Sequence, residues 1–239
     1  MITSAANPRL KLVRKLESPR QREKLGLFAV EGEDLVEAGL DAGLEPVEAL
    51  VDAERPALLD RLPRAETVAP ELLASGSSLP HAARVVAVFR RADLPRDAGS
   101  RAAALALWRV ADPGNLGTLV RAADALGPAA VGLSAGCADP TGPKALRASA
   151  GALFRVPLAA FDELSAPWIG LVPAGGVPLP ELDLPERATF ALGAEREGLP
   201  ESVLARCAAL ATIPQAAQAE SLNVAVAGAI ALYEWRRRR

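Results

Sequence analysis

The 239-residue sequence predicts an α/β protein built from two units. Short apolar runs alternate along the chain with segments in which apolar residues recur at helical spacing. Most of these runs are bounded by glycine or proline, which is typical of buried strands in a parallel sheet. Residues 91–101 interrupt the alternation with the Pro, Gly, Ser and charge content of a linker. We therefore expect a small N-terminal α/β domain at residues 1–90, a linker at 91–101 and a larger domain at 102–239.

The first ninety residues predict a small module of alternating helices and strands. In chain order, we expect helices at 7–16 and 19–26, a strand at 27–32, a helix at 33–43, a strand at 47–51, a helix at 54–62 and a strand at 84–90. Gly43 closes the third helix, because a residue without a Cβ can adopt the left-handed conformation that ends a helix.

After the linker, strand-like runs follow one another with helical segments between them. The expected strands lie at 103–110, 129–134, 168–174, 189–193 and 209–213, and the clearest helices at 115–127 and 224–235. Buried strands joined by helical segments predict a mainly parallel sheet with helices on both faces. The last helix has a single clear polar residue, Glu234, and is therefore expected to be buried on all sides.

Charge is distributed unevenly, although the formal net charge is only −2. Residues 1–25 carry two acidic side chains against seven basic ones, namely Arg9, Lys11, Arg14, Lys15, Arg20, Arg22 and Lys24. A cationic arm on an acidic protein is suited to bind a polyanion, and a solvated helix face is the alternative interpretation. The run Arg236–Arg239 has two similar interpretations, a phosphate contact or a soluble end of the chain.

The composition disfavours several classes of protein. No apolar run is both long and uncharged enough to span a bilayer, and the N-terminus lacks the regions of a signal peptide. Cys137, Cys207 and the only histidine, His81, are too scattered for a disulfide framework or a metal site. Glycine-rich motifs of dinucleotide-binding and P-loop proteins do not occur. We expect a cytoplasmic protein without a metal ion and without a membrane partner.

Three loops that follow predicted strands carry polar residues, and ligands bind beyond the carboxyl ends of such strands. The first loop places Asn115 before a helix that carries Arg121. The second holds Glu195 between two glycines, and the third supplies three polar side chains at 220–223, where a helix requires one cap. Each residue alone has a structural explanation, since Asn115 can cap its helix and acidic residues favour helix N-termini.

Taken together, the three loops resemble the three motifs of the SpoU (TrmH-like) family of SPOUT RNA ribose 2′-O-methyltransferases. The matching segments are DPGNLGTLVRAADALG, FALGAEREGLP and IPQAAQAESLNVAVAGAIALYE, which span residues 112–234. The N-terminal half resembles the RNA substrate-binding domain of many rRNA-modifying members, in SAANPRLKLVRKL, FAVEGEDLVEAGL and LPHAARVVAVFRR. The resemblance implies an L30e-like N-terminal domain and a catalytic domain with a deep trefoil knot.

The resemblance also implies S-adenosylmethionine (S-adenosyl-L-methionine) as methyl donor, bound in a bent shape by the knotted loops. By position, Gly193, Ile213 and Leu222 are expected to contact this cofactor. Family members commonly have Met and Gly where this chain has Gln215 and Ala217, so this part of the loop can follow a different path.

In the family, the arginine of the first motif activates the ribose hydroxyl, which implies this role for Arg121. An arginine is effectively always protonated, so two accounts are open. Either burial and a nearby phosphate let the side chain accept the proton transiently, or it stabilises the developing alkoxide while phosphate or water takes the proton. The residues expected to orient the reactants are Asn115, Glu195, Ser221 and Asn223.

The expected substrate is rRNA, because members that act on tRNA often rely on short terminal extensions instead of a full N-terminal module. The alternatives are tRNA 2′-O-methylation and, outside the enzymes, a non-catalytic RNA-binding or ribosome-assembly protein. Arg14, Lys15 and Arg22 are the expected RNA contacts on the N-terminal arm. As in the family, the apolar helix at 224–235 is expected to form a homodimer interface.

Overall fold

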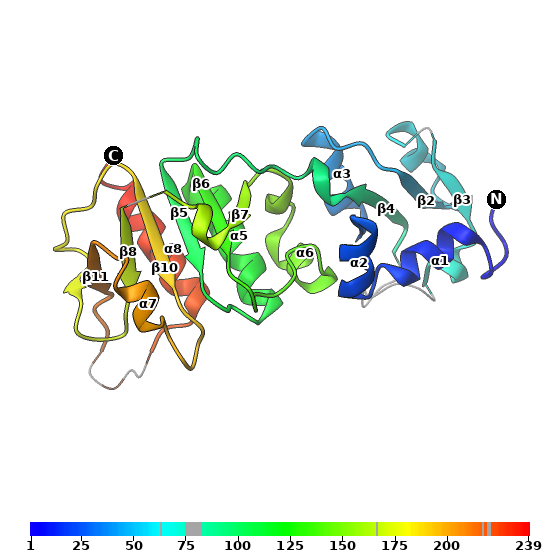
Figure 1. Cartoon of the computed structure of the whole chain (residues 1–239). Coiled ribbons are helices and arrows are strands. Elements are labelled where there is room, and N and C mark those ends of the chain that lie inside the picture. The colour runs from blue at the N-terminus through cyan, green and yellow to red at the C-terminus, as the bar shows by residue number, and fades with distance from the viewer. Residues whose placement is uncertain (63, 75–82, 166, 217, 219–220) are drawn as a thin grey trace.

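The computed structural model describes residues 1–62, 64–74, 83–165, 167–216, 218 and 221–239. His81 and Ala217, which were named above, lie outside these ranges, as does Glu220, the first of the three polar residues at 220–223. The chain forms two α/β units that lie end to end, with the N-terminal unit at the right of Figure 1. None of the described helices is both long enough and apolar enough to cross a membrane.

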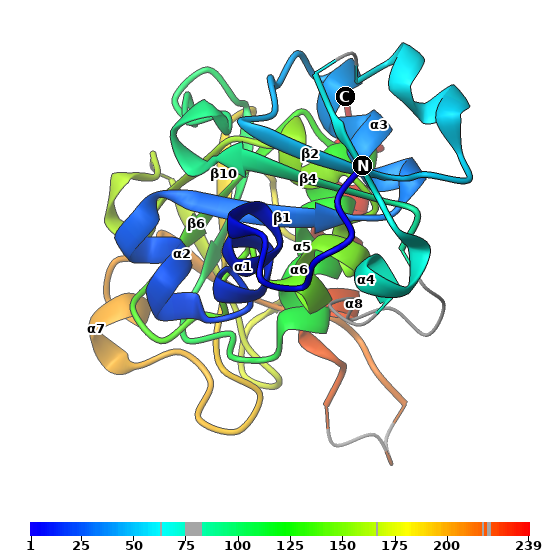
Figure 2. The same cartoon turned by 90° about the vertical axis from the view of Figure 1, so that its right-hand side faces the viewer.

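The N-terminal unit is built on a mixed four-stranded sheet with the order β1-β4-β2-β3. β1 (Leu27–Glu31) and β2 (Glu48–Asp52) run antiparallel to β4 (Val85–Arg90), and β3 (Glu66–Val68) runs parallel to β2. The helices are α1 (Pro8–Lys15), α2 (Pro19–Leu25), α3 (Glu33–Asp41) and α4 (Pro70–Ala74), with a 3-10 helix, η1, at Pro56–Asp60. Figure 2 looks onto this unit, with β2, β4 and β1 crossing the view side by side.

The C-terminal unit contains a seven-stranded sheet in the order β7-β6-β5-β10-β8-β11-β9, and each pair of neighbours is parallel. Its strands are β5 (Ala103–Leu107), β6 (Ala129–Leu133), β7 (Leu158–Ala160), β8 (Trp168–Leu171), β9 (Val177–Pro178), β10 (Ala188–Leu192) and β11 (Ala209–Thr212). Its helices are α5 (Pro113–Leu126), α6 (Pro143–Ser149), α7 (Glu201–Leu204) and α8 (Val224–Arg236). Short 3-10 helices are η2 (Arg91–Asp93), η3 (Ala152–Phe154) and η4 (Phe161–Glu163). The predicted α/β class and parallel sheet are confirmed.

Side chains of β5 show how both faces of this sheet are covered. Leu105 and Leu107 point into the core that contains α5 and α8. Ala104 and Ala106 point to the opposite face, where Val203 of α7 packs. Successive residues of a strand alternate between faces, so one strand serves both layers. The expectation of helices on both faces is therefore confirmed.

Short elements account for most differences from the prediction. The helix expected at 54–62 is only the 3-10 helix η1, and the sequence does not predict β3, α4, α6, β7 or β9. The strands β3, β7 and β9 have only two or three residues, and the helices α4 and α6 have five and seven, so little hydrophobic period can show in them.

The two units share a core of aromatic rings at their junction. Phe28 and Phe89 of the N-terminal sheet pack on Phe154 of η3, with ring centroids 6.4 and 6.1 Å from it. All three rings are buried. Beside them, Gly151 comes so close that a Cβ on it would lie 2.6 Å from the Cβ of Ala38. Apolar packing therefore joins the units in addition to the chain between them.

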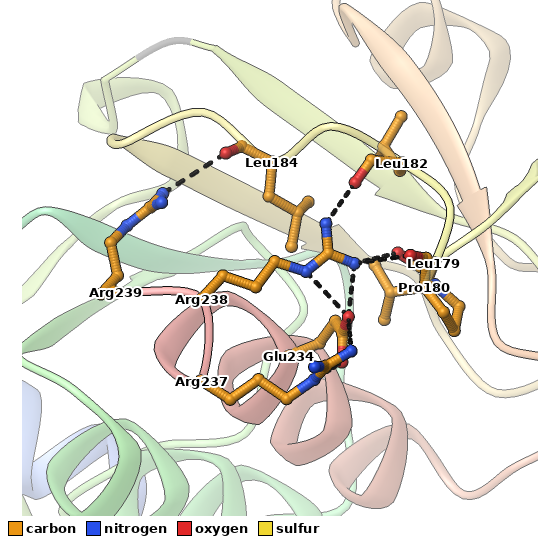
Figure 3. Close-up of polar contacts among 8 residues, drawn as sticks. All are labelled: Leu179, Pro180, Leu182, Leu184, Glu234, Arg237, Arg238 and Arg239. Carbon is orange, nitrogen blue, oxygen red and sulfur yellow. Dashed lines mark hydrogen bonds and ion pairs between the residues drawn. The ribbon is translucent and has the colours of Figure 1, made fainter.

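The side chains of the C-terminal arginines form polar contacts with other parts of the chain (Figure 3). Glu234 is buried in α8 and accepts hydrogen bonds from Arg237 and Arg238, and the bond from Arg237 is the main cause that holds the pKa of Glu234 below its usual value. Arg238 also donates to the carbonyl oxygen of Leu182 at 2.6 Å, and Arg239 contacts that of Leu184 at 3.5 Å. These contacts attach the C-terminal run to α8 and to the segment 182–184, a structural role that neither interpretation from the sequence describes.

Candidate functional site

The parallel strands bring the three predicted loops to one edge of the sheet. β5, β10 and β11 point in the same direction, so the loops that follow them leave from the same side. A cavity of about 620 Å³ lies there, which we call the larger cavity. Its lining includes the three residues expected to contact a cofactor, Gly193, Ile213 and Leu222. It also includes Glu195, Ser221 and Asn223 from the predicted catalytic set.

A hydrogen-bond network joins the three loops beside this cavity. The side-chain amide of Asn223 donates to Oδ1 of Asn115 at 3.0 Å, and the amide of Asn115 donates to Oε1 of Glu195. Asn223 also caps α8, because its Oδ1 accepts from the backbone N–H groups of Ala225 and Val226 at 2.9 and 3.3 Å. Asn223 therefore has two roles at once: its side-chain oxygen caps α8, and its side-chain nitrogen donates to the network.

Asp112, and not Asn115, caps helix α5. Its Oδ1 accepts from the backbone N–H of Asn115 at 2.8 Å, which leaves the Asn115 side chain to the network. Lys144 donates to the other carboxylate oxygen at 2.7 Å and is the main cause that lowers the pKa of Asp112. The alternative explanation of Asn115 as a helix cap is therefore wrong. Asp112 followed by Pro113 was the usable signal, since proline favours the first position of a helix.

Two glycines shape the loop after β10. A Cβ on Gly193 would lie only 2.1 Å from the backbone carbon of Gly198, so no other residue fits without opening the loop. Gly198 has a φ of +66°, and its N–H donates to the carbonyl of Ala194 at 2.9 Å. The loop is therefore a tight turn whose tip carries Glu195, and its backbone can approach a ligand closely.

Gln215 lines the larger cavity and was treated in the sequence only as a departure from the family motif. Its Oε1 atom is buried and has no hydrogen-bond partner among the described residues. A buried acceptor without a donor is unfavourable, so this atom suits a ligand that brings an N–H group. Within the part of the chain that the structure describes, no cluster of His, Cys, Asp or Glu side chains is arranged to hold a metal ion.

Arg121 is not brought into the cavity by its own chain. It lies exposed on α5 and lines neither this cavity nor a second, smaller cavity of about 280 Å³ that lies beside it. α5 packs against α8, and α8 leaves Val226 and Tyr233 exposed at 47% and 57%. The expectation that the last helix is buried on every side is therefore wrong for the isolated chain.

The predicted RNA contacts on the N-terminal arm differ in their surroundings. Lys15 is exposed, and Arg14 is half-buried with its guanidinium donating to the carbonyl of Ala5 at 3.2 Å. Arg22 is only 3% exposed and forms an ion pair with Asp139 of the C-terminal unit at 2.8 Å. Arg22 is thus corrected from an RNA contact to a link between the two units, because a buried guanidinium cannot reach a phosphate.

Comparison with known proteins identifies the family. A model of the SpoU rRNA methylase family matches residues 102–233, which is more than half of the chain. The chain belongs to this family. A second model, of the MRM3-like substrate-binding domain, matches residues 7–87.

Individual relatives of this SpoU-family chain cover it to different extents. The chain is 33% identical to the 23S rRNA (guanosine(2553)-2′-O)-methyltransferase of Bacillus subtilis, with 98% of each chain covered. The AdoMet-bound rRNA methyltransferase from Sinorhizobium meliloti matches with a TM-score of 0.85 and 29% identity, over 99% of this chain and 97% of that one. A structure solved to study 2-OH methylation of C/U34 on tRNA matches with a TM-score of 0.50 and 31% identity, over 57% of this chain and 95% of its own.

Proposed function

We propose that this SpoU-family protein transfers a methyl group from S-adenosylmethionine to a ribose 2′-hydroxyl of rRNA. The observation that carries the proposal is the network of Asn115, Glu195 and Asn223, which joins three motif loops beside the larger cavity. Capping of α8 needs only the oxygen of Asn223, so the cap does not require the rest of the network. Family membership and the similarity to a 23S rRNA methyltransferase support the same activity.

The residues around the larger cavity fit S-adenosylmethionine. Its volume of about 620 Å³ falls in the range typical of small-molecule sites, about 300–1,000 Å³. Gly193 lets the loop backbone approach a flat group, and Ile213 and Leu222 offer apolar contact. The Oε1 atom of Gln215, which has no partner among the described residues, can accept a hydrogen bond from an ammonium or amino group. The bound cofactor supplies an electrophilic methyl group, and no metal ion is needed.

Arg121 acts on the ribose hydroxyl, which is a poor nucleophile until its proton is withdrawn. Because the guanidinium is exposed in the single chain, we favour electrostatic stabilisation of the developing alkoxide, with the proton passing to phosphate or water. The network holds Asn115 and Glu195 in place to orient the reactants for in-line attack. Ser221 lines the same cavity and contributes its hydroxyl to the ribose side.

The protein acts as a homodimer in which Arg121 of one copy completes the larger cavity of its partner. Arg121 lines neither the larger cavity nor the smaller one beside it in the described part of the chain, so it needs another copy to reach a ribose there. The exposed Val226 and Tyr233 on α8, beside α5, supply an apolar surface for a two-fold contact.

The N-terminal unit favours rRNA over tRNA as substrate. The rRNA methyltransferase of Bacillus subtilis covers 98% of this chain, whereas the structure connected with tRNA methylation covers 57%. tRNA remains the second candidate. A non-catalytic RNA-binding or ribosome-assembly protein would have no use for the polar network and the cavity together.

Several finer features belong to the same proposal. Residues 1–90 form an L30e-like RNA-binding domain, residues 91–101 a linker and residues 102–239 the catalytic domain. The loops that follow β10 and β11 form a deep trefoil knot with α8. Exposed Lys15 and half-buried Arg14 contact RNA phosphates. The protein works in the cytoplasm, which is where bacteria make and modify rRNA.

The decisive experiment measures cofactor binding and methyl transfer separately. Isothermal titration with S-adenosylmethionine should show binding to the wild type and to Arg121→Ala, and only the wild type should methylate 23S rRNA. An equimolar mixture of Arg121→Ala and Asn115→Ala chains should recover about a quarter of wild-type activity, because half of the dimers contain one complete site. Lack of cofactor binding by the wild type would favour the non-catalytic binder, and no recovery in the mixture would place Arg121 in the cavity of its own chain.

A further inference from the structure

A smaller cavity of about 280 Å³ lies beside the larger one and shares the loop 194–197 and Val224 with it. This volume is below the range of about 300–1,000 Å³ that whole small-molecule ligands occupy. It is sufficient for a fragment, such as one phosphate and its sugar. Two cationic side chains, Arg109 and Arg196, line the smaller cavity.

Arg109 occupies a backbone position that its side chain does not favour. It follows β5 with a φ of +54°, and its N–H donates to Oγ of Ser134 at 2.9 Å. Glycine or asparagine adopts this left-handed conformation more easily than arginine. The side chain then passes over Gly136, close enough that a Cβ there would lie 3.4 Å from its Cγ. The backbone alone gives no reason for an arginine, so the reason is to be found in the guanidinium.

The guanidinium of Arg109 has one ion-pair partner among the described residues, Glu197. Its Nη1 lies 3.0 Å from Oε2 of Glu197, and the two side chains are 53% and 68% exposed. Exposed pairs of this kind are weak and readily broken. A guanidinium binds phosphate in the same two-pronged geometry as carboxylate.

The other two carboxylates around the smaller cavity are engaged elsewhere. Asp112 holds Lys144 and the first turn of α5, and Glu195 accepts from Asn115. Glu197 is therefore the carboxylate that can leave without disturbing the polar network.

We propose that Arg109 binds a backbone phosphate of the RNA substrate, and that Glu197 occupies this place until the RNA arrives. This inference rests on the proposed function and adds to it a residue that positions the RNA. Exchange of carboxylate for phosphate turns the smaller cavity into a phosphate subsite next to the methyl-donor cavity. It also moves Glu197 away from the incoming polyanion.

A double-mutant cycle with Arg109→Gly and Glu197→Gln tests the exchange. Arg109→Gly removes the guanidinium and relieves the left-handed backbone, so this variant should fold at least as well as the wild type. Its affinity for in-vitro transcribed 23S rRNA should fall about ten-fold at low salt, since a charge-assisted hydrogen bond is lost. The slope of log affinity against log salt should fall by roughly 0.7–0.9.

Glu197→Gln should tighten binding of the same RNA by about two- to five-fold, because the competing carboxylate is gone. This gain should vanish in the double variant. The matched control is Arg155→Gln, which removes an exposed arginine paired with Asp124 outside both cavities and should leave RNA affinity unchanged. Titration with S-adenosylmethionine should give wild-type affinity for Arg109→Gly and Arg155→Gln, because neither residue lines the larger cavity.

Three results would overturn the inference. Arg109→Gly could retain wild-type affinity and salt slope, Glu197→Gln could tighten binding equally in both backgrounds, or the wild type could fail to bind the rRNA. RNA binding is measured without cofactor, so it decides the inference independently of methyl transfer. If Arg109→Gly weakens RNA binding as expected but the wild type does not bind S-adenosylmethionine, only the proposed activity is refuted.

Discussion

Replacing Arg22 by methionine should loosen the junction between the two units. Arg22 of α2 pairs with Asp139 through Nε at 2.8 Å. Its Nη1 donates to the carbonyl oxygens of Leu16 and Glu17, at the end of α1, at 2.7 and 2.9 Å. Methionine keeps the apolar stem and leaves all three acceptors without this donor. The substitution therefore isolates the guanidinium.

The size of the effect follows from burial. Arg22 is 3% exposed and Asp139 is 17% exposed, and breaking a buried ion pair by removing one partner costs about 3–5 kcal/mol. Asp139 keeps the backbone N–H and the hydroxyl of Thr141 as donors, at 2.9 and 2.7 Å, and the guanidinium of Arg91 at 3.5 Å, which places the expected loss at the lower end, about 3 kcal/mol. For a chain of this length, that loss lowers the Tm by about 6–12 °C.

Acid should remove the same stabilisation. Burial raises the pKa of Asp139, but hydrogen bonds from Thr141 and Arg22 outweigh it and leave the pKa below its usual value. The unfolded chain then binds the proton more readily than the folded chain, so the stabilisation is complete above about pH 4–5 and is lost as pH falls through the lowered pKa. The Tm difference between the wild type and Asp139→Asn should therefore shrink below about pH 4.

Thermal unfolding followed by circular dichroism at pH 7 and at pH 3.5 measures both effects. The matched control is Arg61→Met, because Arg61 pairs with Asp41 on the surface, with side chains 51% and 67% exposed. This control should stay within about 2 °C of the wild type. An Arg22→Met protein as stable as the control at pH 7 would refute the assignment of Arg22 as a link between the units.

Three further outcomes are expected. Asn223→Ala should lose the helix cap, and with it about 1 kcal/mol of stability, and should also lose methyl transfer. Asn223→Asp should keep the cap but lose methyl transfer, because a carboxylate cannot donate to Asn115. Equal stability of the two variants in denaturant would argue against the cap. Gly193→Ala should weaken binding of S-adenosylmethionine, since its Cβ would lie 2.1 Å from Gly198, and unchanged affinity in calorimetry would contradict the tight loop. Lys15→Gln should reduce the salt slope of rRNA binding by roughly 0.7–0.9 without changing cofactor affinity, and an unaltered slope would mean that the arm is only a solvated helix.

Local features of the sequence determined much of the architecture. The apolar runs at 103–107 and 188–192 are buried along their whole length, so hydrophobic patterning alone predicts parallel strands with helices on both faces. Polar loops after such strands meet at one edge, which is why the residues named from three distant motifs line or border one cavity. The two- and three-residue strands β3, β7 and β9 and the short helices α4 and α6 carry no such pattern, and the sequence does not predict them.

Only the tertiary structure decided how individual polar side chains are used. Arg22 looks like its basic neighbours in the sequence, yet the fold buries it against Asp139, 117 residues away. Asn115 and Asn223 bond across 108 residues, and Arg109 meets Glu197 across 88. Period and composition report on the face of one element, whereas burial and pairing depend on which other element arrives there. For that physical reason the sequence indicates where a site lies, and the packing of the whole chain decides which charges remain available to a ligand.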